Sequence, residues 1–295
     1  MVIKRIKNQY IDKKLFLKRE DLLHPSVSGN KLRKLKYNLE FAAKNDFSAL
    51  LTFGGAFSNH IAAVASAGKE FGFKTIGIIR GEELESKIED NATLRFAKHC
   101  GMTFKFVSRS DYRRKTDSDF INNLKDEFDE FYLIPEGGTN ALAIKGCQEI
   151  LTQKDREFDF ICCPVGTGGT ILGLINSALP HQKILGFPAL KGDFLTEEIA
   201  KFATNKNWEL ITDYHFGGYA KVSDELIAFI NQFKHLHNIP LDPIYTGKMM
   251  FGICDLVENG YFPKHSKILA IHTGGLQGIE GMNAKLKQQN RPLIV

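Results

Sequence analysis

Short apolar runs alternate with amphipathic helical patterns along nearly the whole of this 295-residue chain. The runs that we expect to form buried strands are 15–17, 49–53, 75–79, 103–107, 131–134, 158–163, 183–187 and 267–271. Helical patterns lie between them, for example at 32–43, 84–99, 141–151, 222–237 and 276–286. Because strands that alternate with helices need crossover connections, this order predicts an α/β fold with mostly parallel sheets.

Composition places the chain among ordinary globular proteins. Hydrophobic residues make up 43% and charged residues 25%, and the length suits one large or two ordinary domains. The net charge of +5 is too small for this length to indicate a nucleic-acid partner. The densest basic cluster, between Lys31 and Lys36, is short and has no interleaved aromatic residues, so we expect no nucleic-acid binding.

Cysteine usage and the N-terminus favour a cytoplasmic protein without a metal site. The cysteines are odd in number and have no CxxC spacing, which argues against a disulfide framework or a zinc site. Residues 1–14 carry charges and are not followed by the apolar segment of a secretory signal. Two uncharged stretches, 47–68 and 160–182, are each interrupted by a Gly-Gly pair, so they are predicted to be strand, turn and helix rather than membrane spans.

Glycine pairs are the most informative pattern in the chain. At least four of the five directly follow a predicted strand; the pairs are Gly54-Gly55, Gly137-Gly138, Gly168-Gly169, Gly217-Gly218 and Gly274-Gly275. In open parallel sheets, ligands bind beyond the carboxyl ends of the strands, where glycine lets the backbone approach them. A single pair is as readily explained by a tight turn, but several together favour a shared ligand crevice.

The segment ValGlyThrGlyGlyThr at 165–170 lies between a predicted strand and an apolar helix, so its N–H groups and the helix N-terminus suit an anion. It fails the dinucleotide pattern because Ile171 stands where a glycine is needed, and no Walker lysine follows. The segment therefore indicates a phosphorylated cofactor without adenosine. A second turn, GlyGlyAlaPheSerAsnHis at 54–60, could hold another anion or could simply cap a helix through Ser58 or Asn59.

Lys31 is predicted to lie at the start of a helix. The helix macrodipole disfavours a cation at this end, which would lower the amine pKa and favour the neutral form needed for Schiff-base chemistry. An arbitrary lysine is far more often a solvated surface residue, and only the surrounding motifs favour a catalytic role for Lys31. His60, taken alone, is more often a structural histidine than a catalyst.

Six motifs are spread over nearly the whole chain: LysArgGluAspLeuLeu (18–23), SerGlyAsnLysLeuArgLysLeu (28–35), GlyGlyAlaPheSerAsnHis (54–60), GlyThrGlyGlyThr (166–170), AspProIleTyrThrGlyLys (242–248) and HisThrGlyGly (272–275). Together they resemble the 1-aminocyclopropane-1-carboxylate deaminase/D-cysteine desulfhydrase family. The family consists of pyridoxal-phosphate enzymes of fold type II, the tryptophan-synthase-β type. The resemblance implies two three-layer α/β/α domains with mostly parallel sheets: a large one from 1–43 and 149–295, and a small one inserted at 44–148.

The resemblance also implies roles for the motif residues. Lys31 would bind pyridoxal 5'-phosphate as a Schiff base and exchange protons at the substrate α-carbon. The phosphate would lie on Gly166, Thr167, Gly168, Gly169 and Thr170. Asn59 would contact the cofactor's ring oxygen and Thr273 its pyridine nitrogen, where a neutral hydroxyl suits β-elimination better than transamination.

The substrate side would be formed by two other motifs. Ser58 and neighbouring groups of Asn59 and His60 would hold the substrate carboxylate. Tyr219 and Tyr245 would line the substrate side, with Tyr245 as a proton donor or acceptor, although Tyr219 could equally be an ordinary buried tyrosine. A role for His272 stays open.

Thr246 bears on the choice of substrate. Ring-opening deaminases that resemble this chain carry glutamate at that position, whereas desulfhydrase-like members carry threonine. We therefore expect α,β-elimination from D-cysteine to pyruvate, sulfide and ammonia, with opening of 1-aminocyclopropane-1-carboxylate to 2-oxobutanoate and ammonia as the alternative. If the position matters, Thr246→Glu should raise ring-opening activity.

Other classes of function predict different behaviour. A non-catalytic protein that binds pyridoxal phosphate for storage or regulation would bind the cofactor without turning over amino acids. A homodimer is an expectation from the family only.

Overall fold

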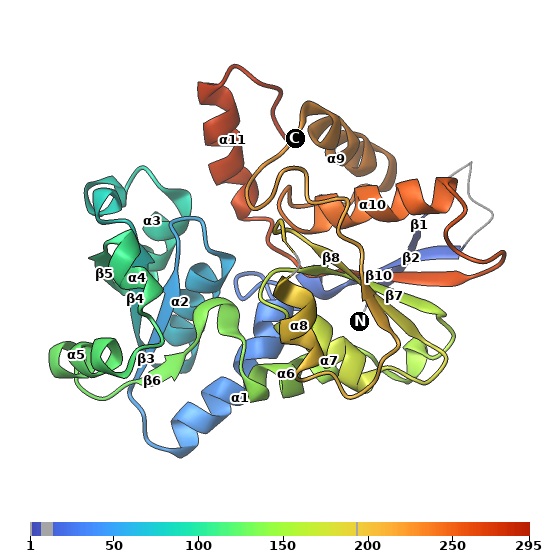
Figure 1. Ribbon diagram of the computed structural model, residues 1–295. Coiled ribbons are helices and arrows are strands. Elements are labelled where there is room, and N and C mark those ends of the chain that lie inside the picture. Colours follow the sequence, from blue (N-terminus) through green and yellow to red (C-terminus); the bar gives the residue numbers. More distant parts are fainter. Residues whose placement is uncertain (1, 7–13, 193) are drawn as a thin grey trace.

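The computed structural model describes residues 2–6, 14–192 and 194–295, and its strands form two separate sheets. The six-stranded sheet has the order β1-β2-β10-β7-β8-β9, in which only β1 runs antiparallel to its neighbour. Its strands are β1 (Ile3–Ile6), β2 (Lys14–Arg19), β7 (Phe160–Val165), β8 (Lys183–Pro188), β9 (Trp208–Leu210) and β10 (Lys267–His272). Figure 1 shows the two lobes that surround the two sheets. The mixed α/β architecture with mostly parallel sheets is therefore confirmed.

The four-stranded sheet is entirely parallel, with the order β5-β4-β3-β6. Its strands are β3 (Ala49–Gly54), β4 (Lys74–Arg80), β5 (Thr103–Val107) and β6 (Tyr132–Ile134). All eight predicted runs are strands, but β5 and β6 are only partly buried. These two are the edge strands of their sheet, so one side of each has no strand neighbour. The short strands β1 and β9 were not predicted.

Helices cover both sheets, and the prediction of one continuous helix at 84–99 is wrong. The pattern at 84–99 forms a 3-10 turn, η2 (Glu82–Lys87), followed by a separate helix, α3 (Ala92–His99). The break occurs because Asn91 caps α3, with its side-chain oxygen accepting a hydrogen bond from the Leu94 N–H at 3.0 Å. The remaining elements are η1 (Glu20–Leu22), α1 (Asn30–Lys44), α2 (Asn59–Phe71), α4 (Arg109–Arg113), α5 (Ser118–Phe128), η3 (Glu136–Gly138), α6 (Ala141–Gln148), η4 (Gln153–Asp155), α7 (Gly169–Ser177), α8 (Phe194–Ala200), α9 (Asp224–His237), α10 (Thr246–Glu258) and α11 (Gly278–Gln288).

The small sheet lies wholly within 44–148 and the large sheet within 1–43 and 149–295. Two helices depart from that division. Leu35 and Leu39 of α1 pack into the core of the small sheet, whereas Cys147 of α6 packs into the core on one face of the large sheet. Because α1 and α6 also pack against each other, they join the two lobes. The domain boundaries stay a prediction.

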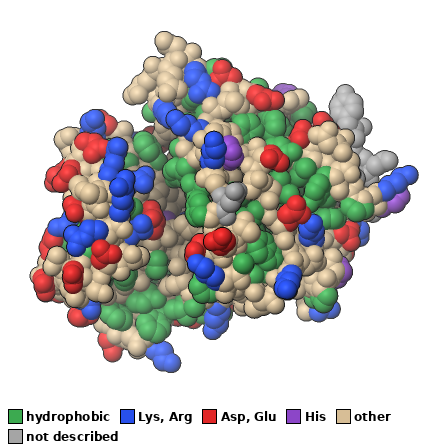
Figure 2. All heavy atoms as spheres, in the orientation of Figure 1, with side chains coloured by type: hydrophobic (Ala, Val, Ile, Leu, Met, Phe, Trp, Pro, Cys, Tyr) green, Lys and Arg blue, Asp and Glu red, His purple; other side chains and the backbone are tan. Residues whose placement is uncertain are grey.

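Charge is dispersed over the visible face of the molecule. Figure 2 shows Lys and Arg side chains interspersed with Asp and Glu rather than gathered into one basic patch. No helix in the described part of the chain is long and apolar enough to cross a membrane. The cysteines are all free, and no cluster of His, Cys, Asp or Glu within the described ranges could hold a metal ion.

Candidate active site

Four of the five glycine pairs contribute to one cavity of about 610 Å³, whereas Gly217-Gly218 does not line it. Gly55 follows β3, Gly137 follows β6, Gly168 follows β7 and Gly274 follows β10, and all four line the cavity. The start of α1 and the segment around Tyr245 complete its wall. The predicted shared crevice beyond the carboxyl ends of the strands is therefore present as a cavity, and its ligand stays a prediction.

The start of α1 is held against the loop that follows β10. The Asn30 N–H donates a hydrogen bond to the Thr273 carbonyl at 3.2 Å, which requires a very close approach of the two backbones. Gly29 makes that approach possible, since it has a φ of 59° and a Cβ there would lie 2.0 Å from the Thr273 oxygen. This contact points Lys31 into the cavity, where its Nζ lies 3.3 Å from the Asn30 side-chain oxygen.

Lys31 has the properties of a nucleophilic amine. Burial, together with the nearby positive charge of Lys34, lowers its pKa to about 7. The direction of this shift agrees with the prediction from the sequence, but its causes are burial and Lys34 rather than the helix macrodipole. At neutral pH a large part of the Lys31 population is therefore uncharged and able to attack a carbonyl.

The turn between β7 and α7 has the geometry of an anion site. Gly168 adopts a φ of 85°, and α7 begins at Gly169 with its N-terminus directed at the cavity side of the turn. Thr167 and Thr170 line the cavity, and the Thr170 hydroxyl accepts a hydrogen bond from the Asn30 side-chain amide at 2.7 Å. Asn30 therefore connects the lysine of α1 to this turn.

Lys34 places a buried amine beside the same turn, and burial lowers the pKa of this amine. Its Nζ donates to the Gly137 carbonyl at 2.8 Å and lies 3.1 Å and 3.4 Å from the hydroxyls of Thr139 and Thr167. Its side chain is almost fully buried, and no carboxylate among the described residues forms an ion pair with it. Because an uncompensated buried ammonium is costly, this arrangement suits an anion bound on the turn at 166–170. A phosphate group fits both the N–H groups of this turn and the Lys34 side chain.

The second glycine turn starts α2 beside the cavity. Ser58 caps the helix, with its hydroxyl accepting from the Ile61 N–H at 3.3 Å, so the predicted capping role is confirmed. The side-chain oxygen of Asn59 is buried and has no hydrogen-bond partner among the described residues. Such an orphaned polar atom at a cavity wall is expected to bond to a ligand. These two side chains therefore suit a polar ligand on this side.

His60 is a neutral histidine that joins the small sheet to the cavity. Its Nε2 lies 2.9 Å from the Thr52 hydroxyl, while its Nδ1 is buried without a partner in the described part of the chain. Burial, together with the charges of Lys31 and Lys34, holds its pKa well below the usual value. His60 is therefore uncharged at neutral pH.

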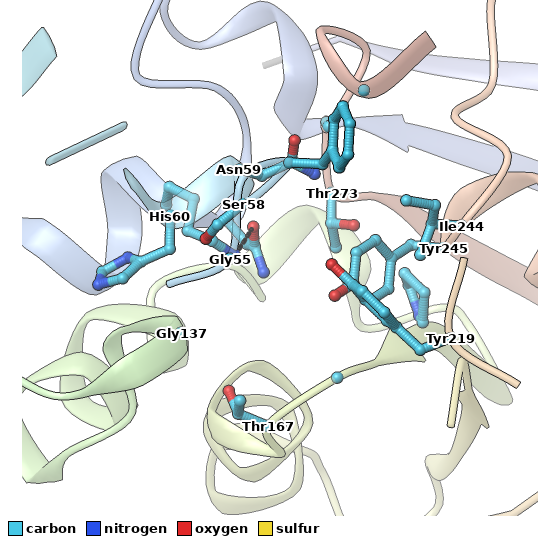
Figure 3. Close-up of a pocket in the computed structure, with 18 of the residues that line it drawn as sticks. Gly55, Ser58, Asn59, His60, Gly137, Thr167, Tyr219, Ile244, Tyr245 and Thr273 are labelled. Atoms are coloured by element: carbon cyan, nitrogen blue, oxygen red, sulfur yellow. Dashed lines mark hydrogen bonds between the residues drawn. The ribbon is translucent and has the colours of Figure 1, made fainter. Parts of the chain in front are cut away.

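Two tyrosines lie across the cavity from the glycine turn at 54–60. Figure 3 shows Tyr219 and Tyr245 side by side, opposite Ser58 and His60. Their ring centroids are 6.3 Å apart in an edge-to-face arrangement. Burial raises the pKa of Tyr245 well above its usual value, so its phenol keeps its proton at neutral pH.

Asp242 fixes Tyr245 at the start of α10. Its carboxylate accepts hydrogen bonds from the N–H groups of Ile244 at 3.0 Å, Tyr245 at 2.9 Å and Thr246 at 2.7 Å. This is an extended form of helix capping, and the negative charge also suits the positive end of the helix. The sequence motif at 242–248 therefore includes the group that orients its own tyrosine.

Some predicted site residues do not reach the cavity. Thr246 is fully buried and its hydroxyl is bonded to Asp242, donating at 2.7 Å and accepting from the Asp242 N–H at 2.9 Å. Gly169 lies within the first turn of α7, behind the cavity wall. His272, whose role the sequence leaves open, is also buried outside the cavity, with Nε2 2.8 Å from the Pro240 carbonyl. The other predicted residues, including Thr273, all line the cavity.

Several residues that line the cavity were not predicted from the sequence. They are Asn30, Lys34, Arg80, Glu136, Gln277 and Lys285. Lys34 follows Lys31 by three residues, which places both on one face of a helix, so the helical spacing could have indicated it. No motif marks Arg80 or Glu136, because they reach the cavity only through the fold of the small sheet.

Comparisons with known proteins agree with this geometry. Residues 3–274 match the family model described as pyridoxal-phosphate dependent enzyme. The chain belongs to this family of enzymes, which use pyridoxal phosphate as cofactor.

Within it, the chain belongs to the 1-aminocyclopropane-1-carboxylate deaminase/D-cysteine desulfhydrase family. It is 31% identical to a protein of Pyrococcus abyssi that is provisionally named 1-aminocyclopropane-1-carboxylate deaminase, over 90% of this chain and 85% of the relative. It is 28% identical to the mitochondrial bifunctional D-cysteine desulfhydrase/1-aminocyclopropane-1-carboxylate deaminase of Arabidopsis thaliana, over 90% of this chain and 73% of the relative. A crystal structure described as an ACC deaminase homologue superimposes with a TM-score of 0.85 and 29% identity, covering 97% of this chain and 93% of that one.

Proposed function

We propose that this protein catalyses α,β-elimination on a small amino acid, and that D-cysteine is converted to pyruvate, sulfide and ammonia. The observation that carries the proposal is the placement of a neutral amine, Lys31, in one cavity with a protonated phenol, Tyr245. An elimination needs a base at the α-carbon and a proton donor at the leaving group. These two residues supply both.

The cofactor would be held by the groups already described. The Gly166–Thr170 turn and Lys34 would bind its phosphate, Asn59 its ring oxygen and Thr273 its pyridine nitrogen, while Lys31 would bind it covalently. When bound, pyridoxal phosphate supplies an electron sink that stabilises negative charge at the substrate α-carbon. Thr273 contributes a neutral hydroxyl to the cavity, which suits elimination better than transamination.

The chain's own residues would act in sequence on D-cysteine. Ser58 and the amides at the start of α2 would hold the substrate carboxylate. The Lys31 amine, set free when the substrate amine takes its place on the cofactor, would take the proton from the α-carbon, and Tyr245 would give a proton to the sulfur as the carbon–sulfur bond breaks. Water then releases ammonia from the resulting enamine, so one water is consumed for each pyruvate, sulfide and ammonia formed.

A second reaction is supported by the names of the relatives. Opening of 1-aminocyclopropane-1-carboxylate to 2-oxobutanoate and ammonia would use the same carboxylate site. Because the α-carbon of this substrate carries no hydrogen, Lys31 would take a proton from a ring methylene carbon instead. The position of Thr246 does not decide between the two reactions directly, because its side chain lies behind the cavity wall. Any effect of Thr246 would pass through Asp242 and the orientation of Tyr245.

Product analysis separates these reactions. The holoenzyme would be incubated in parallel with D-cysteine, L-cysteine and 1-aminocyclopropane-1-carboxylate, with sulfide, pyruvate and 2-oxobutanoate measured in each sample and Lys31→Ala as the control. Sulfide and pyruvate from D-cysteine, in equal amounts and only with Lys31 present, are expected. 2-Oxobutanoate without sulfide would replace the proposal by the ring-opening reaction. Cofactor binding with no product from any amino acid would contradict both reactions.

The expectations of a cytoplasmic location and a homodimer belong to the same proposal. Free cysteines are compatible with a reducing compartment. Size-exclusion chromatography with light scattering would test the dimer directly.

A further inference from the structure

The segment that carries Tyr219 has little regular structure of its own. It lies between β9 and α9, and Phe216, Gly217, Gly218 and Ala220 all have positive φ values. For Phe216 and Ala220 this conformation is unfavourable by about 1 kcal/mol or more each. Residues 215–220, which we call the Tyr219 loop, therefore need interactions from outside to keep this shape.

Lys248 supplies such an interaction from the first turns of α10. Its side chain is only 2% exposed, and its Nζ donates to the main-chain oxygens of His215 and Gly218, each at 2.8 Å. These two carbonyls enclose Phe216 and Gly217, which both have positive φ, and Gly218 directly precedes Tyr219. Hydrogen bonds from a charged donor are among the stronger ones in proteins.

No carboxylate in the described part of the chain forms an ion pair with Lys248. Burial lowers its pKa to about 8, and the negative charge of Asp242 opposes that shift. The ammonium form therefore still predominates at neutral pH. A buried cation whose hydrogen bonds go to loop carbonyls is a costly way to stabilise a fold, which suggests that the loop's position matters for the site.

Lys248 also links the two tyrosines of the cavity. Tyr245 lies three residues earlier, at the start of the same helix, where Asp242 holds its backbone. The helix end thus fixes Tyr245 through Asp242 and reaches the Tyr219 loop through Lys248. The ring of Tyr219 packs edge-to-face against that of Tyr245, and Figure 3 shows both at the cavity.

We propose that Lys248 is a positioning residue, which holds Tyr219 against Tyr245 on the substrate side of the cavity by bonding the main chain of the Tyr219 loop. Lys248 does not line the cavity itself, so it acts on the substrate only through that loop. The inference rests on the proposed function for the identity of the substrate side, but the position of the loop can be tested without turnover.

The first test is hydrogen exchange of the holoenzyme. Lys248→Met keeps the length of the side chain and removes every donor, whereas Lys248→Gln keeps one polar group and serves if the first variant does not fold. Amides of residues 215–221 are expected to exchange at least about tenfold faster in both variants, with α10 unchanged. The exposed Lys221, which belongs to the same segment, gives the matched control Lys221→Met, with no change expected in this loop.

The second test uses D-alanine as a probe, because it has the substrate carboxylate and amine but no leaving group. Its dissociation constant, measured from the change in visible absorption, is expected to rise at least about tenfold in Lys248→Met while the absorption of the bound cofactor stays unchanged. Tyr219→Ala should show a similar rise. In the Tyr219→Ala background, Lys248→Met should add nothing further, since both act through one ring.

The outcomes separate this proposal from the proposed function. Unchanged exchange in the Tyr219 loop of both Lys248 variants would overturn it, and so would effects of Lys248→Met and Tyr219→Ala that simply add. A wild-type enzyme that releases no product but shows the expected exchange and D-alanine results would overturn only the proposed reaction.

Discussion

At pH 7 about half of the Lys31 side chains should be neutral, because burial and Lys34 lower the pKa to about 7. An ordinary lysine with a pKa of 10.5 would be neutral in only about one molecule in 3,000 at that pH. The cavity therefore increases the supply of reactive amine by about a thousandfold. The rate at which cofactor-free protein captures pyridoxal phosphate should rise about tenfold per pH unit below pH 7 and level off above it.

The assay is stopped-flow absorption after mixing the cofactor-free protein with pyridoxal phosphate between about pH 5.5 and about pH 9.5. A free lysine derivative, measured at the same pH values, corrects for titration of the cofactor itself. In Lys34→Gln the midpoint should move to higher pH, since the charge that repels the Lys31 ammonium is gone. A rate that keeps climbing through pH 9 without levelling would refute the lowered pKa.

Substitutions at three further positions test the packing around the cavity, each through the free energy of unfolding measured with denaturant. Gly29→Ala forces a Cβ onto the Thr273 carbonyl and should cost at least about 2 kcal/mol and loosen cofactor retention, so an unchanged midpoint would contradict the close approach. Thr246→Val removes the hydroxyl that bonds Asp242 and should cost about 1–3 kcal/mol, whereas Thr246→Ser should stay close to wild type. Ser58→Ala should cost about 1 kcal/mol through the lost cap and weaken D-alanine binding without slowing cofactor capture; equal D-alanine affinity would remove Ser58 from the carboxylate site.

The fold was largely predictable because its signals are local. Runs such as 49–53 and 267–271 are strands buried on both faces, so their apolar character is continuous and easily read. The wrong helix at 84–99 has a local cause in the cap at Asn91. The edge strand β9 could not be predicted, since it has only three residues and pairs with β8 alone.

The site was predictable where one motif supplies both the residue and its neighbours in sequence. Lys31 and the turn at 166–170 are of this kind. Lys34 and Lys248 act through contacts with segments that are distant in the sequence. Asp242 acts through hydrogen bonds to the N–H groups at the start of α10. These roles could therefore not be predicted from the sequence. Thr246 shows the converse, because a residue inside a motif can serve the motif's own structure and lie outside the cavity.

The most direct test of the central claim combines cofactor, anchor and reaction in one cuvette. The visible absorption spectrum of the protein with pyridoxal phosphate would be recorded beside that of Lys31→Ala, followed by addition of D-cysteine and detection of sulfide. A cofactor band that depends on Lys31, with sulfide released only by the wild type, is the predicted result. The absence of any Lys31-dependent band would contradict the assignment of this cavity as a pyridoxal-phosphate site anchored by Lys31.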